Sequence, residues 1–266
     1  SALREENHMS FILDCACHCR VGKVRSNNED NILFDGKCLE EQNTGLRNPV
    51  VCQSVLSHGS ACFAVFDGMG GEDFGEAASY TAACTMRAET KRLADFLVPE
   101  HAFLAQSCAK MNRAVFDAAL ARGTRHMVST AAMLLFSPQQ VYCCNIGDSK
   151  IFRLRGGVFM QLSRDHTDEA LLQEMGITNR RPRLTQYLGI DPDEMEIQPH
   201  IAKGELQRGD RYLICSDGLT DMVPNFELCS TLLVNPTAEK CADRLMRQAM
   251  STGGRDNTTV IVIRVL

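Results

Sequence analysis

The chain has 266 residues, of which 44% are hydrophobic and 23% charged, a composition typical of a folded globular protein. Its 28 Lys and Arg against 33 Asp and Glu give a net charge of −5, which argues against a nucleic-acid partner bound through a general basic surface. The longest apolar runs fall far short of the roughly 18 residues that suggest a membrane span, so we expect no membrane segment.

The first eight residues, SALREENH, end in a His-Met junction typical of a cloning site. We therefore expect Ser1–His8 to be a remnant and residues 9–266 to form a single domain. No repeat, low-complexity tract or linker-like stretch divides the chain after this point.

The predicted elements come in blocks along the chain. A strand at Phe11–Cys19 and a short buried strand at Ala61–Phe66 are followed by helices at about Phe74–Leu97 and Glu100–Ala121. Closely spaced strands then suggest hairpins, at Thr130–Phe136, Val141–Asn145, Lys150–Arg155 and Val158–Leu162. The remaining elements are a short helix at Asp168–Met175, a strand at Arg211–Cys215, a helix capped by Asn235 or Thr237, and a strand at Thr258–Val265. Helices grouped between antiparallel strands predict an α+β protein with a strand-on-strand core and helices outside.

The 13 cysteines are an odd number and lie mostly in apolar runs, which favours buried free thiols in a reducing, cytoplasmic compartment. Cys15, Cys17 and Cys19, with His18, have the residue types of a zinc site. Their spacing is C-x-C-x-C, and alternate residues of a strand share one face, so we interpret them as packing residues.

Acidic residues stand close to the ends of the apolar strands. They are Asp67 after ACFAVF, Asp217 shortly after RYLIC, Asp256 shortly before TTVIVIRV, Asp148 in the turn NIGDS, and Glu29 and Asp30 in RSNNEDN. A single Asp-Gly is typical of an ordinary turn. Five such loci together suggest a cluster of carboxylates, which would repel one another unless cations lay between them. Oxygen ligands without His or Cys suit Mg²⁺ or Mn²⁺. Arg25, four residues before Glu29, is either a solvated charge or a clamp for a phosphate group.

Eight blocks lie in order along the chain: GKVRSNNEDN, FAVFDGMGGEDFGEAAS, STAAMLLF, NIGDSKIFRLRGG, LSRDHT, LTQYLGI, DRYLICSDGLTDMV and GGRDNTTVIVIRV. Their residues, order and spacing closely resemble the metal-dependent protein serine/threonine phosphatases of type 2C, the PPM family, in its bacterial form. The resemblance implies an antiparallel β-sandwich flanked by helices on both faces, an α-β-β-α arrangement of four layers. It also implies a binuclear metal site at one end of the sandwich.

The resemblance implies metal ligands residue by residue. Asp67 would bridge two Mn²⁺ or Mg²⁺ ions, and the backbone carbonyl of Gly68 would bind one of them. Asp217 and Asp256 would hold the other ion.

Other roles follow from the same resemblance. Glu29 and Asp30 would orient metal-bound waters or bind directly, and Asp148, with Asp217, matches the weaker third-metal site of many members. Arg25 would grip the substrate phosphate.

The implied reaction is hydrolysis of phosphoserine and phosphothreonine by in-line attack of a metal-bridging hydroxide, without a phosphoenzyme intermediate. A cysteine-dependent phosphatase would need a cysteine six residues before an arginine in a glycine-rich loop, and we expect no such pair. Met69 stands where animal members often carry a histidine proposed as general acid. His166 is a candidate for that task, with a structural histidine as the alternative.

Two other functions remain open. A catalytically inactive, phosphatase-like binding or signalling module is one, but such members usually lose metal carboxylates that this chain retains. A hydrolase of small phosphorylated metabolites is the other. As an active enzyme, the chain is expected to be a cytoplasmic monomer that acts on phosphorylated proteins and opposes a serine/threonine kinase.

The segment Ser163–Gly189 corresponds to the flap that lies beside the active site in the family. It carries four arginines, Arg164, Arg180, Arg181 and Arg183. These are either solvated charges or groups that help to recruit a phosphorylated peptide.

Overall fold

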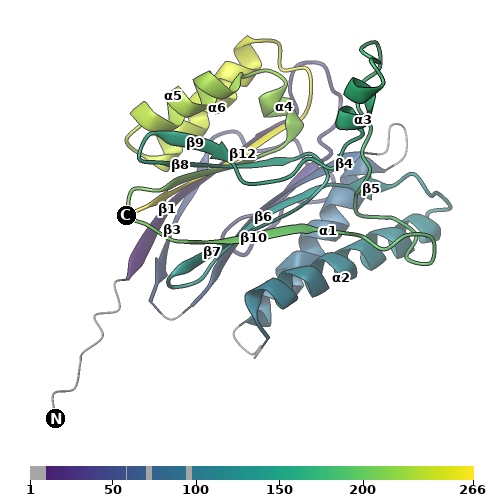
Figure 1. The fold of residues 1–266 in the computed structure, drawn as a ribbon, viewed down its shortest axis with the longest axis horizontal. Helices are drawn as coiled ribbons and strands as arrows, with labels where there is room; N and C mark the ends of the chain where they lie inside the picture. The colour runs from purple at the N-terminus through teal and green to yellow at the C-terminus, as the bar shows by residue number, and fades with distance from the viewer. Residues whose placement is uncertain (1–9, 58, 70–73, 94–97) are drawn as a thin grey trace.

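The computed structural model describes residues 10–57, 59–69, 74–93 and 98–266, so the predicted remnant Ser1–His8 lies outside the described residues. Two antiparallel β-sheets pack face to face, and helices cover the outer face of each sheet (Figure 1). The predicted four-layer α-β-β-α sandwich is thereby confirmed. No helix in the described ranges combines the length and the apolar character needed to cross a membrane.

Each sheet mixes strands from distant parts of the chain. The first sheet has the order β3 (Val50–Leu56), β1 (Phe11–Arg20), β12 (Thr258–Val265), β11 (Arg211–Cys215), β8 (Lys150–Arg155), β9 (Val158–Gln161). The second has the order β10 (His200–Glu205), β7 (Gln140–Ile146), β6 (Ala131–Phe136), β4 (Ala61–Met69), β2 (Asp30–Leu33), with β5 (Val128–Ser129) paired to β4.

The helices divide between the two outer faces (Figure 1). α1 (Gly75–Lys91) and α2 (Glu100–Ala121) cover the second sheet, whereas α4 (Asp217–Thr220), α5 (Asn225–Val234) and α6 (Ala238–Ser251) lie on the side of the first. The short α3 (Glu169–Glu174) stands apart in the flap. Thr237 caps α6 as predicted, since its hydroxyl accepts a hydrogen bond from the Lys240 amide at 3.2 Å. The predicted helix from Phe74 ends earlier, at Lys91, and residues 94–97 are outside the described ranges.

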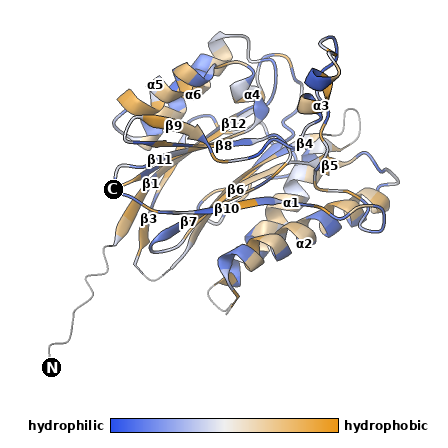
Figure 2. Ribbon diagram, in the orientation of Figure 1, coloured by the Kyte–Doolittle hydropathy of each residue, from blue (hydrophilic) through white to orange (hydrophobic). Residues whose placement is uncertain are grey.

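The layers explain why the central strands are apolar on both sides. In β12, Ile261 and Ile263 pack between the two sheets, whereas Val260 and Val262 pack beneath the helices of the first sheet. α2 has only one face on a sheet, and it carries both apolar and polar residues (Figure 2). Cys15 and Cys17 belong to the core between the sheets, which agrees with their interpretation as packing residues. All 13 cysteines are free.

Four strands and two helices were not predicted from the apolar pattern. β2 is only four residues long and begins with Asp30 and Asn31, and the edge strand β3 exposes Val51 and Val55 to solvent. The two-residue β5, β10, α4 and α5 were likewise not predicted. Short or edge elements bury little apolar surface, so their hydrophobic periodicity is weak.

Candidate active site

The strand register brings Asp30 and Asp67 together. Asp30 at the start of β2 pairs directly with Asp67 near the end of β4. The Asp67 amide donates to the Thr130 hydroxyl at 3.1 Å, and the Thr130 amide donates back to the Asp67 carbonyl at 2.8 Å. The Thr130 hydroxyl also lies 2.7 Å from that of Ser149. Asp67 is therefore held by Thr130, which lies between β5 and β6, and Thr130 in turn contacts Ser149 in the turn that contains Asp148.

Two acidic residues of the first sheet, Asp217 and Asp256, lie at the same end of the sandwich. Cys215 at the end of β11 pairs with Val260 in β12, so Asp217 and Asp256 leave neighbouring strand ends. The two sheets meet at Asp30, whose Oδ2 accepts hydrogen bonds from Ser216 at 2.8 Å and Thr259 at 2.6 Å. Asp30 is 1% exposed, and its Oδ1 has no hydrogen-bond partner among the described residues.

The carboxylates influence one another electrostatically. Burial raises the pKa of Asp30 to about 7, and the charges of Asp256 and Glu29 add to the rise, while the bonds from Thr259 and Ser216 oppose it. Burial and the charges of Asp148 and other aspartates raise the pKa of Asp217 to about 7. The pKa of Asp67 is raised well above its ordinary value, first by burial and then by the charge of Asp30.

Glu29 and Asp148 complete the acidic cluster. Burial raises the pKa of each of them, and the charge of Asp148 in turn raises the pKa of Asp67 and of Asp217. We refer to Glu29, Asp30, Asp67, Asp148, Asp217 and Asp256 as the acidic cluster. Within the described ranges, no three His, Cys, Asp or Glu side chains are already placed so as to hold a metal ion. The assignment of individual ligands therefore stays a prediction.

Gly68 stands where two backbone segments approach each other closely. Its amide donates to the Glu29 carbonyl at 3.0 Å, and a Cβ atom at this position would lie 2.0 Å from the Gly75 carbonyl oxygen. Any side chain here would separate the end of β4 from the start of α1. The site thus depends on glycine for packing, whatever its carbonyl binds.

Arg25 lies at the rim of the acidic cluster. Its guanidinium donates to the Asp256 carboxylate at 2.7 Å, with 49% of the arginine side chain exposed. This hydrogen bond is the main cause that raises the pKa of Arg25, and the charges of Glu29 and Asp67 add to it. The geometry leaves part of the guanidinium open to solvent beside the carboxylates.

Three supporting residues were not identified from the sequence. Ser216 and Thr259 hold Asp30, as described above. Asn257 accepts from the Glu29 amide at 2.8 Å and donates to the carbonyls of Val21 and Asn27 at 2.9 and 2.8 Å. It therefore ties the loop that carries Arg25 and Glu29 to the start of β12. Its position next to Asp256 was the one sequence signal available.

Cys19 stands six residues before Arg25, but it lies within β1 and Gly22 is the single glycine between the two residues, so they do not form the glycine-rich loop of a cysteine-dependent phosphatase. The thiol is buried, accepts a hydrogen bond from the Asn28 side-chain amide at 3.1 Å, and lies 3.1 Å from the Thr259 hydroxyl, which donates its proton to Asp30. Burial raises the pKa of Cys19 to about 12. A thiolate nucleophile is disfavoured there, because the reactive form of cysteine is the anion.

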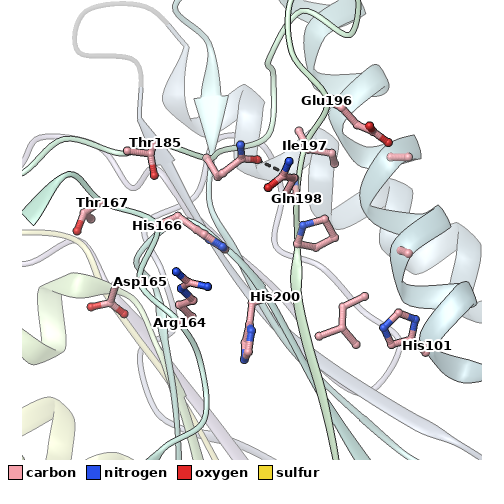
Figure 3. A pocket seen from close by; sticks show the side chains of 15 residues that line it. His101, Arg164, Asp165, His166, Thr167, Thr185, Glu196, Ile197, Gln198 and His200 are labelled. Atoms are coloured by element: carbon pink, nitrogen blue, oxygen red, sulfur yellow. Dashed lines mark hydrogen bonds between the residues drawn. The ribbon is translucent and has the colours of Figure 1, made fainter. Parts of the chain in front are cut away.

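His166 lies behind the Asp148 turn, in a groove of about 820 Å³ beside α2 and β10. Figure 3 shows its ring in this groove together with Arg164 and His200. The His166 Nδ1 accepts a hydrogen bond from the Gly147 amide at 3.1 Å, and the His166 amide donates to the Gly147 carbonyl at 3.0 Å. These bonds give the histidine a structural role in holding the turn, which favours the structural alternative over the general acid.

Comparison with known proteins identifies the family to which the fold belongs. A model of the family described as protein phosphatase 2C matches residues 47–252. The serine/threonine phosphatase stp of Listeria innocua is 29% identical over 253 residues, which cover 91% of this chain and 92% of the relative.

Solved structures share the fold over nearly the whole chain. The catalytic domain of the phosphatase PstP, solved in complex with two manganese ions, is 27% identical, with a TM-score of 0.75 over 96% of this chain and 99% of that one. PstP is a protein of Mycobacterium tuberculosis. The phosphatase MsPP of Mycobacterium smegmatis, solved with cacodylate, is 30% identical, with a TM-score of 0.69 over 94% of this chain and 97% of that one. Because the family model spans most of the chain and the sandwich is shared, this chain belongs to the protein phosphatase 2C family, in its bacterial form.

Proposed function

We propose that the acidic cluster is the active site at which this metal-dependent protein serine/threonine phosphatase hydrolyses phosphoserine and phosphothreonine. Residues 9–266 would form its single catalytic domain. The observation that carries the proposal is the convergence of carboxylates from both sheets, which raise one another's pKa values beside Arg25. Such a group is stabilised as anions when divalent cations lie between its members.

The donor set fits hard cations, since it offers carboxylate and carbonyl oxygens and no thiolate or imidazole. We assign Asp67 and the Gly68 carbonyl to one of two Mn²⁺ or Mg²⁺ ions, with Asp67 shared by both, and Asp217 and Asp256 to the other. When bound, the ions supply Lewis acidity: they lower the pKa of water toward neutrality and offset charge on phosphoryl oxygens.

The remaining members of the acidic cluster would act around these ligands. The free Oδ1 of Asp30 is a buried acceptor that suits a water donor, and Glu29 lies beside it in the chain. Asp148, with Asp217, is assigned to a third, weaker ion. Each of these assignments follows from the resemblance to the family, and the position and charge of these residues in the acidic cluster support it.

Arg25 would hold the phosphate. Its guanidinium is suited to two phosphate oxygens at once, and it opens to solvent beside Asp256. Water would attack phosphorus in line and displace the serine or threonine alkoxide, so that no phosphoenzyme forms. Fixed positive charge next to the phosphoryl oxygens is the principal requirement of such a transfer.

Phosphate release from a phosphothreonine peptide tests the proposal. We expect turnover with Mn²⁺ or Mg²⁺, none with EDTA, and loss of turnover in Asp217→Asn. The matched control is Asp117→Asn, which neutralises an exposed carboxylate of α2 that pairs with Arg113. Folded wild-type protein that is inactive with every metal would support the inactive binding module. Faster turnover of a small phosphorylated metabolite than of any phosphopeptide would support the metabolite hydrolase.

We further propose that the protein acts as a monomer in the cytoplasm and opposes a serine/threonine kinase. One chain carries all eight predicted site residues, which supports activity without a partner subunit. The free state of all 13 cysteines fits a reducing compartment. Co-expression with a protein kinase, followed by measurement of phosphothreonine in shared targets, tests the opposition.

A further inference from the structure

A second groove opens directly beside Arg25 and Asp256. It has a volume of about 390 Å³, and its lining includes three arginines, Arg25, Arg181 and Arg255, against two aspartates, Asp221 and Asp256. The groove therefore shares Arg25 with the proposed phosphate site. A peptide whose phosphate lay on Arg25 could therefore reach the other two arginines from within the same groove.

The three guanidinium groups come from separate segments and differ in how they are held. Arg25 is bonded to Asp256 at 2.7 Å. Arg181 has a 90% exposed side chain and lies 3.5 Å from the Asp221 carboxylate. Arg255 is exposed, and no hydrogen bond or ion pair joins it to a residue of the described ranges. Two of the three arginines therefore keep most of their donors available.

The structure separates Arg181 from the other flap arginines. Arg180 forms an ion pair with Asp168, and Arg164 lines the other groove, the one that contains His166 (Figure 3). Arg183 is not among the residues that line the groove at Arg25. Of the four flap arginines, Arg181 is the one placed beside the proposed phosphate site.

We infer that Arg181 and Arg255 form a specificity subsite for an acidic side chain close in sequence to the phosphorylated residue of a protein substrate. This inference rests on the proposed function, because Arg25 defines where the phosphate lies. Arginine pairs a carboxylate through two parallel N–H···O bonds. The same pair of arginines repels a basic neighbour, so the subsite discriminates in both directions.

A panel of phosphothreonine peptides tests the subsite. A single aspartate is moved from three positions before the phosphothreonine to three positions after it, in an otherwise neutral sequence. At one or two adjacent positions we expect the KM to fall about fivefold at low salt with kcat unchanged, the size of an exposed ion pair. The preference weakens as salt is added, because exposed charges are screened.

Variants assign the preference to the two arginines. Arg181→Ala with Arg255→Ala is expected to bring the KM ratio of neutral to acidic peptide close to one, and Arg255→Glu to favour a lysine at that position instead. Arg113→Ala, which removes an exposed arginine of α2, is the matched control and keeps the preference. An acidic preference that survives the double substitution, or that is absent from the wild type, overturns the inference.

The failure of the subsite is distinguishable from failure of the proposed function. If the wild-type protein hydrolyses all the peptides with equal KM, the subsite inference is wrong and the proposed function stands. If the wild-type protein hydrolyses neither the peptides nor p-nitrophenyl phosphate with Mn²⁺, the proposed function is wrong, and so is the subsite inference that rests on it.

Discussion

The carboxylate of Asp30 on β2 accepts a hydrogen bond of 2.6 Å from the hydroxyl of Thr259 on β12, and this bond joins the two sheets at the acidic end of the sandwich. Ser216 adds a second bond to the same oxygen at 2.8 Å. β2 is short and lies at the edge of its sheet, so backbone pairing fixes it on one side only. The side-chain bonds therefore determine how the acidic residues of one sheet face those of the other.

Replacing Thr259 with valine is expected to destabilise the protein by about 1–3 kcal/mol, because a buried carboxylate loses a donor. Urea denaturation in EDTA measures the change. Thr258→Val is the matched control: its hydroxyl is also buried but bonds to the nearby Asp256 carbonyl at 3.2 Å. An equal or larger loss in Thr258→Val would contradict a special role for the bond between Thr259 and Asp30.

Binding of Mn²⁺ is expected to raise the melting temperature of the wild-type protein, since an ion bound only by the folded state adds about 2.7 kcal/mol at 100 times its Kd. Asp217→Asn removes a proposed ligand and shrinks this increase. Differential scanning calorimetry with Mn²⁺ and with EDTA measures it without reference to activity. Asp117→Asn should keep the full increase, and the metal site assigned to Asp217 is wrong if both variants respond like the wild type.

Arg25→Ala is expected to lower kcat/KM for a phosphothreonine peptide by about 10²-fold, as for loss of one group that stabilises a transition-state oxyanion. Arg25→Lys should recover part of the loss, because lysine keeps the charge but not the two-pronged contact. Lys23→Ala, an exposed cation in the same loop, is the control for general charge. Steady-state kinetics with saturating Mn²⁺ provides the measurement, and wild-type kinetics in Arg25→Ala would remove the arginine from the phosphate site.

His18 should make the protein less stable as the pH falls. Its side chain is 3% exposed, and burial, followed by the charge of Arg20, lowers its pKa below 6.5 in the folded state. Below pH 6.5 the unfolded chain binds a proton that the folded protein resists, so the free energy of unfolding decreases by at most about 1.4 kcal/mol per pH unit. His18→Leu should flatten the decrease between pH 6.5 and 5.

Chemical denaturation at several pH values checks this, with the exposed His126→Leu as the control that retains the wild-type profile. A decrease that is as steep in His18→Leu as in the wild type would assign it to other groups.

The local pattern of apolar residues was enough to predict the strands that bury both of their faces. β6 is apolar throughout, and β11 and β12 contain the apolar runs Tyr212–Cys215 and Val260–Ile263, because a strand between another sheet and a layer of helices buries both of its faces. β3 carries Val51 and Val55 on its exposed side, so its apolar residues do not mark the buried face. β2 and β10 were missed for a different reason, since each contains only two apolar residues, Ile32 and Leu33 in β2 and Ile201 and Ala202 in β10.

By itself, the sequence determined which carboxylates stand at strand ends and which family of phosphatases they resemble, because both are written in residue type and short spacing. Only the tertiary structure decided that Asp30 pairs with Asp67 and that Thr259, 229 residues away in the chain, donates to Asp30. It also decided that Arg181, and not Arg180, lies beside Arg25. Strand register and contacts between the two sheets fix these relations. The pattern of residues around one position does not specify which distant residue it will contact.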